Sequence, residues 1–276
     1  METADGRPVI ENGGHMTTFL LKIIALLSML IDHIGAVFPI QSAMIFRWVG
    51  RISFPLFAYM IAQGCIYTKN IYKYMLRLAV FAVVSEIPFD AAFGNGISFL
   101  RDTNIFYTLF FAVSAIAAYN FLIVRIELSK KCQKPRNSSP RLYDKQEGLL
   151  SKKTFIVAAI SVIPSLILAE LLSTDYGAVG VLLIYMLYLV PKGATPIVLA
   201  AGMFILYGAN IFDYTDVSGW VFSRNAAGLF FFSLISIPLV LFHNGKQGPK
   251  LKWLFYVSYP LHLLILAQVL YLGFRI

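Results

Sequence analysis

The sequence predicts an all-α protein: a polytopic integral membrane bundle of about nine (eight to ten) transmembrane helices. Composition and segment length both lead to this prediction. Of the 276 residues, 58% are hydrophobic and only 13% are charged, and the mean hydropathy is +0.72. Soluble domains carry about a quarter charged residues, so an ordinary soluble protein is excluded. The two cysteines, Cys65 and Cys132, are too few for a disulfide framework or a metal site, and no metal is expected.

Nine apolar segments follow one another along the chain, separated by short polar turns. They are residues 17–38, 50–68, 72–92, 105–126, 154–173, 177–190, 195–211, 226–242 and 251–273. The sixth and seventh are short and flanked by glycine or proline, which sets the range of eight to ten crossings. One extended polar stretch, a basic loop at 127–153, divides the chain into four helices and five.

The N-terminal residues 1–15 are polar and lack the apolar run of a signal peptide. We interpret them as a tag, so that Met16 begins the native chain. A single transmembrane domain would then span residues 16–276. His15 is not expected to belong to a site.

Lys and Arg residues are distributed unequally between the two sides that nine crossings define. The side with the N-terminus carries 15 of them, and the other side carries four, which are Arg47, Arg101, Arg224 and Arg275. The positive-inside rule therefore predicts a cytoplasmic N-terminus and an outer C-terminus. The net charge of +9 then reflects cytoplasmic loops, and no nucleic acid is expected as a partner. We expect the 127–153 loop to act as a topological anchor and His243 to lie on the cytoplasmic surface.

The first segment contains the strongest candidate site, LIDHIGA, with Asp32 and His33 in the outer half of the membrane. Ionisable groups in hydrocarbon are costly unless paired, so they are candidates for function. Histidine exchanges protons near neutral pH, and a carboxylate can fix its tautomer. Sequence neighbours point about 100° apart on a helix, however, so Asp32 can instead pair with Arg51. A purely structural hydrogen bond between helices is the alternative for each.

The second segment, GRISFPLFAYMIAQG, places the polar ends of two side chains on one helical face. Tyr59 and Gln63 are spaced i,i+4 toward the cytoplasmic half, where they suit a polar ligand or an interhelical hydrogen bond. Arg51 lies at its outer end. Pro55 is expected to kink or loosen the helix.

The third segment carries a basic ladder, Lys69, Lys73 and Arg77, that climbs from the cytoplasmic rim. Such a ladder can take the phosphates of a nucleotide-like donor, although lipid anchoring also explains the lysines. At its other end Glu86 is expected in the same outer layer as Asp32.

Further polar residues gather toward the outer face. Asn104 opens the fourth segment, and Asp175 and Tyr176 lie in the turn after the fifth, where turn chemistry alone is the alternative. His262 follows Pro260 in the last segment and could assist a site or be a buried, satisfied histidine.

Five ordered motifs carry a resemblance to a known family. LIDHIGA, GRISFPLFAYMIAQG, YKYMLRLAVFAVVSEIPFD, STDYGAVGVLL and FYVSYPLHLLIL together resemble the TraX family, over most of the chain except the basic loop and residues 195–225. The resemblance implies a multi-pass acyltransferase of the bacterial cytoplasmic (inner) membrane, similar to the protein that acetylates the N-terminus of conjugative pilin. It also implies a relationship to the acyltransferase-3 enzymes and to heparan-alpha-glucosaminide N-acetyltransferase, which take acyl groups from cytoplasmic acyl-CoA.

For individual residues, the resemblance matches His33 to the early catalytic histidine of the superfamily. The Arg-x-x-Arg signature of the acyltransferase-3 loop is not found in this sequence. The implied donor is acetyl-CoA, with its phosphates near the basic ladder and with Tyr59 and Gln63 along its path. The expected acceptor is a hydroxyl or amine of a peptide N-terminus, glycan or small molecule at the outer side of the bilayer.

The expected mechanism makes His33 the general base, oriented by Asp32 or Glu86. Asn104 or Tyr176 would polarise the thioester carbonyl. Arg51, Asp175 and His262 complete the predicted acceptor side. Direct transfer and an acetyl-histidine intermediate both remain open.

Two other classes of function fit the same residues. A small-solute or proton-coupled transporter also places Asp, His, Glu and Arg inside a bundle. An accessory assembly protein without catalysis would tolerate loss of His33.

Overall fold

The computed structural model describes residues 14–94, 102–131, 152–215, 219–249 and 251–273. Most of the predicted tag and of the predicted basic loop lies outside these ranges. The helices are α1 (Thr18–Val37), α2 (Ala43–Gly50), α3 (Ser53–Tyr67), α4 (Ile71–Phe93), α5 (Ile105–Lys131), α6 (Lys152–Leu171), α7 (Gly177–Leu189), α8 (Thr195–Met203), α9 (Arg224–Leu234), α10 (Ser236–Leu241) and α11 (Lys252–Gly273). A short 3₁₀ helix (Lys192–Ala194), a π-helical turn (Phe204–Gly208) and a hairpin of β1 (Phe212–Thr215) and β2 (Gly219–Phe222) complete the described elements.

The all-α membrane fold predicted from the sequence is confirmed. Each of the nine predicted segments coincides with one helix or with two consecutive helices. Six stretches of the described chain are long and apolar enough to cross a membrane, namely Thr18–Val37, Ala43–Tyr67, Ile105–Ile126, Thr154–Leu171, Arg224–Leu241 and Trp253–Leu272. The charged α4 and the shorter apolar helices are not among these six, so the exact number of crossings stays a prediction.

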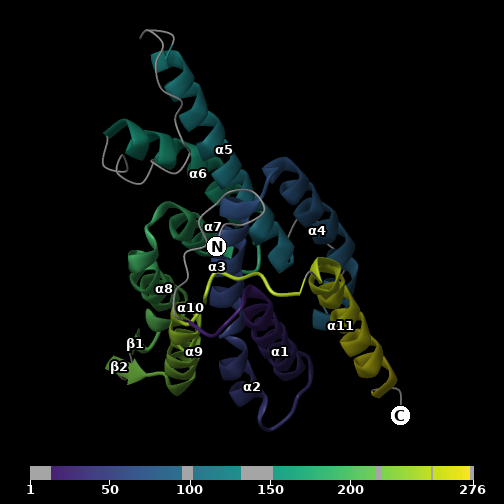
Figure 1. Ribbon diagram of the computed structural model, residues 1–276. Coiled ribbons are helices and arrows are strands. Elements are labelled where there is room, and N and C mark those ends of the chain that lie inside the picture. Colours follow the sequence, from purple (N-terminus) through teal and green to yellow (C-terminus); the bar gives the residue numbers. More distant parts are fainter. Residues whose placement is uncertain (1–13, 95–101, 132–151, 216–218, 250, 274–276) are drawn as a thin grey trace.

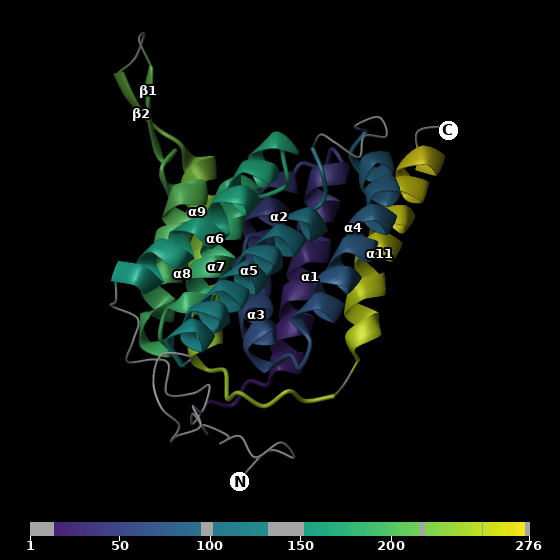
Figure 2. The same ribbon diagram turned by 90° about the horizontal axis from the view of Figure 1, so that it is seen from above.

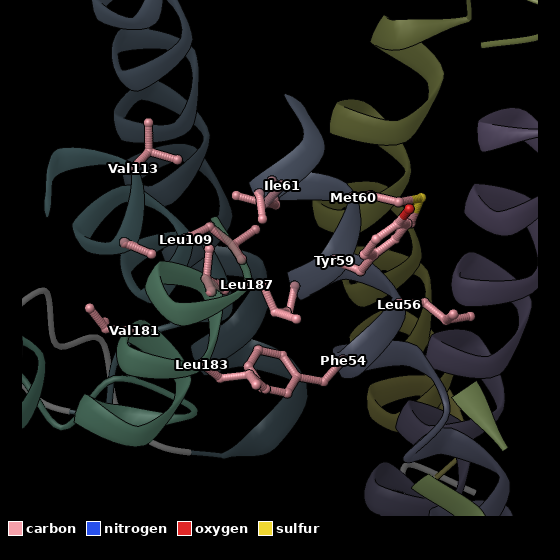
Figure 3. Packing of buried hydrophobic residues seen from close by; sticks show 14 of the residues in the cluster. Phe54, Leu56, Tyr59, Met60, Ile61, Leu109, Val113, Val181, Leu183 and Leu187 are labelled. Atoms are coloured by element: carbon pink, nitrogen blue, oxygen red, sulfur yellow. The ribbon is translucent and has the colours of Figure 1, made fainter. Parts of the chain in front are cut away.

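Helix α3 lies at the centre of the bundle, packed against α1, α5 and α7 (Figure 1). Figure 3 shows Ile61, Leu109 and Leu187 pointing toward one another where α3, α5 and α7 meet. Helices α4 and α11 form one flank and α8 to α10 the other (Figure 1). Large apolar side chains on the outer surfaces remain exposed, for example Phe155 and Leu76. This arrangement is typical of a bundle whose surroundings are lipid.

The predicted second segment, 50–68, coincides with α3, and the extra helix α2 precedes it. Helix α2 ends at Gly50 and α3 begins at Ser53, so the break precedes Pro55. Pro55 lies in the first turn of α3, where a missing backbone N–H leaves no intrahelical bond unmade. Helix α3 then continues as one helix to Tyr67, so the prediction that Pro55 kinks or loosens this helix is wrong.

The two ends of the bundle carry different structures (Figure 2). The hairpin projects at the end where α11 terminates, which we call the hairpin end. The segment His243–Pro249 runs across the opposite end, the loop end. It is attached to the start of α1, because Thr18 N donates to Lys246 O (2.8 Å) and Phe19 N donates to Gln247 O (3.1 Å).

Candidate functional site

A cavity of about 820 Å³ runs through the bundle. Its lining comes mainly from α1, α3, α4 and α11, together with the His243–Pro249 segment and the turn before α7. The lining includes exposed residues at both ends, Tyr67 and Gln247 at the loop end and Asp175 at the hairpin end. The volume is typical of a site for a small organic ligand.

The loop end of the cavity is basic and aromatic. Lys22 on α1 and Arg77 on α4 both line it, and Gln63 on α3 adds an amide. The Lys22 Nζ lies 5.2 Å from the centre of the Phe255 ring. The buried Nε of Arg77 has no hydrogen-bond partner among the described residues. Two cations, one of them with an N–H left unpartnered within the described chain, therefore line the same end of the cavity.

His243 holds the loop segment against the bundle. Its Nε2 lies 2.9 Å from Thr18 Oγ1 and its Nδ1 lies 3.0 Å from Tyr59 Oη. The residue is only 6% exposed, so the prediction of a surface histidine is wrong. Burial lowers the pKa of His243, and the charge of Lys192 lowers it further. The Tyr59 hydroxyl is thus hydrogen-bonded to His243, and Tyr59 does not line the cavity.

The middle of the cavity is apolar. Met29, Phe57, Met60 and Leu109 line it, from helices α1, α3 and α5. A long, thin chain passing from one end to the other would meet few competing polar groups in this part.

His33 on α1 lines the cavity toward the hairpin end. Its Nδ1 lies 2.6 Å from Nε2 of His262 on α11, and the two rings are nearly parallel. His262 Nδ1 in turn lies 2.7 Å from the carbonyl oxygen of Ser258. His262 does not line the cavity. Tyr259 and Phe93 pack edge-on against the His33 ring and fix its position further.

Asp32 pairs with two arginines. Arg47 Nη1 donates to its Oδ2 over 2.8 Å, and Arg51 Nη2 lies 3.7 Å from its Oδ1. Such close packing requires Gly50, because a Cβ at that position would collide with the Asp32 side chain. The alternative pairing of Asp32 with Arg51 is therefore present in the structure, and Arg47 is its closer partner.

Arg51 connects this ion pair to the turn before α7. Its Nη1 donates to Tyr176 Oη over 3.4 Å, and its guanidinium lies 5.4 Å from the centre of the Tyr207 ring. The Tyr176 ring stacks on Phe54, with 3.6 Å between ring centres. Arg51, Tyr176 and Asp175 all line the cavity at its hairpin end.

Glu86 and Asn104 lie together outside the cavity lining. Both are fully buried, and Glu86 Oε2 accepts hydrogen bonds from the backbone N–H (3.2 Å) and the side-chain amide of Asn104. Asn104 also donates to Ala82 O (2.8 Å) and accepts from Phe106 N (3.0 Å). Their contacts fasten the start of α5 to α4.

A family model described as TraX protein matches residues 18–270. The chain belongs to the TraX family. This TraX-family chain is also 26% identical, over 269 residues, to a protein of Dichelobacter nodosus described as probable fimbrial assembly protein FimC, serogroup H1. The match covers 91% of this chain and 95% of that protein. No solved structure matches.

About half of the predicted site residues line the cavity of this TraX-family protein. They are Asp32, His33, Arg51, Gln63, Arg77, Asp175 and Tyr176. The others do not line it, and these are Tyr59, Lys69, Lys73, Glu86, Asn104 and His262. Lys73 is exposed on the rim, so its place in the ladder does not bring it to the cavity.

Lys22 was not predicted as a site residue, although a signal for it exists. It is a charged residue more than one turn inside the first apolar segment, the same criterion that selected Arg77. Within the described residues, no group of three or more His, Cys, Asp or Glu side chains could hold a metal ion.

Proposed function

We propose that this TraX-family protein is a membrane-embedded acetyltransferase. It would take an acetyl group from acetyl-CoA at the loop end and deliver it to a hydroxyl or amine acceptor at the hairpin end. The observation that supports this proposal is that Lys22 and Arg77 at one end and His33 at the other line the same cavity.

The cavity suits a donor that is charged at one end and reactive at the other. Lys22 and His33 lie 11 residues apart on α1, a rise of about 16 Å. Lys22 offers a compact ammonium and Arg77 a planar guanidinium, and both groups bind phosphates. The apolar middle of the cavity suits the thin pantetheine arm of coenzyme A. Lys69 and Lys73 would attract the donor only from the rim.

Transfer at the hairpin end needs a base beside the thioester. His33 would accept the proton of the acceptor hydroxyl or amine as that group attacks the thioester carbonyl carbon. The carbon–sulfur bond then breaks, and the coenzyme A thiolate takes the proton from His33. Tyr176 and Arg51, which line the cavity at its hairpin end, would donate hydrogen bonds to the developing oxyanion. Transfer through an acetyl-histidine intermediate is the competing route.

The relative from Dichelobacter nodosus is described as a fimbrial assembly protein. We therefore propose that the acceptor is a component of a fimbria or pilus at the outer side of the bacterial cytoplasmic membrane. A peptide N-terminus, a glycan and a small molecule are the acceptor types to be screened.

Donor binding can be tested without knowing the acceptor. The melting temperature of the detergent-purified protein should rise with acetyl-CoA or coenzyme A concentration above the dissociation constant, but not with free adenosine. Arg77→Ala and Lys22→Ala should each weaken binding about 10- to 100-fold, the effect of losing one charge-assisted hydrogen bond. The matched controls Arg125→Ala and Lys192→Ala, which alter residues outside the lining, should bind like wild type. The absence of any shift at millimolar acetyl-CoA would refute the proposal.

A transporter would use the same cavity differently. Reconstituted acetyltransferase should release free coenzyme A thiol only when acceptor is present, and His33→Ala should abolish the release. Accumulation of a solute in vesicles, without thiol release, would assign the cavity to transport instead.

A further inference from the structure

The contact between His33 and His262 joins residues 229 positions apart, from α1 and α11. The three groups Ser258 O, His262 and His33 form a chain of two short hydrogen bonds, 2.7 Å and 2.6 Å long. The chain ends at the cavity, because His33 lines it while His262 does not.

The chemistry of the chain fixes its protons. A backbone carbonyl only accepts, so His262 Nδ1 must carry the hydrogen that it donates to Ser258 O. A neutral imidazole has one N–H, so His262 Nε2 carries a lone pair and accepts. His33 Nδ1 must then be the donor of the second bond. The lone pair of neutral His33 consequently lies on Nε2.

The second ring nitrogen of His33, Nε2, is the one available as a base. No hydrogen bond to His33 Nε2 is present in the part of the chain that the structure describes. A general base needs a lone pair, not a proton, on the nitrogen that meets the acceptor. If His33 carried its proton on Nε2 instead, that nitrogen could only donate.

We infer that His262 is a positioning residue that sets the tautomer of His33 and thereby makes Nε2 the basic atom. The inference rests on the proposed acetyl transfer. His262 occupies the place that a carboxylate holds in other histidine-dependent sites, while Asp32, next to His33 in sequence, is engaged by Arg47. When His33 accepts the acceptor's proton at Nε2, its Nδ1–H stays bonded to His262, and the proton returns to the leaving thiolate.

Two substitutions separate this role from simple packing. His262→Gln can keep an acceptor oxygen near the position of the imidazole Nε2, whereas His262→Leu removes the acceptor and keeps a side chain of similar bulk. We expect His262→Leu to lower kcat at least about 100-fold, within the range for general base catalysis, with the KM for acetyl-CoA changed less than about threefold. His262→Gln should retain kcat within about tenfold. Leu261→Ala, at the neighbouring exposed position, is the matched control and should behave like wild type.

The tautomer can be observed without any acyl donor, by nitrogen NMR of the protein labelled in its four histidine rings. His33→Asn and His262→Gln assign the two signals. In the wild type, both rings should be protonated at Nδ1 alone, and His262→Leu should give His33 an Nε2–H population. A wild-type His33 protonated at Nε2 would overturn the inference, as would equal kcat losses in the Gln and Leu variants. If the NMR result is as expected but no acetyl transfer occurs, the proposed function fails and the tautomer assignment stands.

Discussion

Asp32→Asn tests whether the carboxylate serves the two arginines or the histidine beside it in sequence. The substitution keeps the shape of the side chain and removes its charge. The Asp32 and Arg51 side chains are only 10% and 12% exposed, whereas the Arg47 side chain is 30% exposed. Breaking a buried ion pair costs about 3 to 5 kcal/mol, because the remaining charge is stranded. We expect a loss of about 3 kcal/mol, the low end of this range, since Arg47 can regain water and Arg51 lies 3.7 Å away.

The assay is the free energy of unfolding from SDS titration in mixed micelles. In a double-mutant cycle, Asp32→Asn combined with Arg51→Gln should be less destabilising than the two single losses together by about 1 to 2 kcal/mol. Asp32→Asn combined with the remote Arg125→Gln should be additive within about 0.5 kcal/mol. A loss below about 1 kcal/mol together with a large fall in kcat would refute this reasoning and restore Asp32 as a group that orients His33.

Three further outcomes follow from contacts in the structure. Gly50→Ala should cost about 1 to 3 kcal/mol, because the new Cβ would collide with Asp32, whereas Gly193→Ala, with nothing within 4 Å, should stay within about 0.5 kcal/mol in the same SDS titration. Because the pKa of His243 is lowered in the folded protein, the unfolded chain binds more protons than the folded one as the pH falls through about 6.5. The free energy of unfolding should therefore decrease on acidification below that pH. His243→Gln should make this decline shallower between pH 7.5 and 5, and parallel curves would contradict the assignment. Glu86→Gln should keep acetyl transfer within about threefold, since Glu86 does not line the cavity, and a loss of 100-fold or more would show that it acts in the reaction.

Hydropathy located the helices because it reports the property that a bilayer selects, the length of an apolar segment. It could not locate the break between α2 and α3, which depends on local backbone geometry around Arg51 and Ile52. The hairpin at Phe212–Thr215 and Gly219–Phe222 was also not predicted, because it lies in the connection at 212–225, between two apolar segments, where hydropathy reports nothing about short strands.

Sequence spacing selected the ionisable residues inside the spans, but it could identify only some of their partners, such as Arg51 for Asp32. The motif LIDHIGA singled out Asp32 and His33, and its spacing left open whether Asp32 orients His33 or pairs with Arg51. A helix turns successive side chains about 100° apart, and the structure sends Asp32 toward Arg47 and His33 toward His262. The second pairing joins the first and last helices, so no local pattern could reveal it.

The same geometry explains why one member of the basic ladder lines the cavity and two do not. Lys69, Lys73 and Arg77 are spaced at i,i+4 intervals, and this places them on one stripe of α4 but does not say how deep each side chain lies. Only Arg77 is far enough into the bundle to reach the cavity, where it meets Lys22 from α1. A cation inside the hydrocarbon region must find a partner, water or a ligand. Arg77 keeps a buried donor without a hydrogen-bond partner among the described residues, and an anionic group entering from the loop end would satisfy it. The depth of a charge within a span is therefore a better guide to contact with the cavity than the length of a charged ladder at its rim.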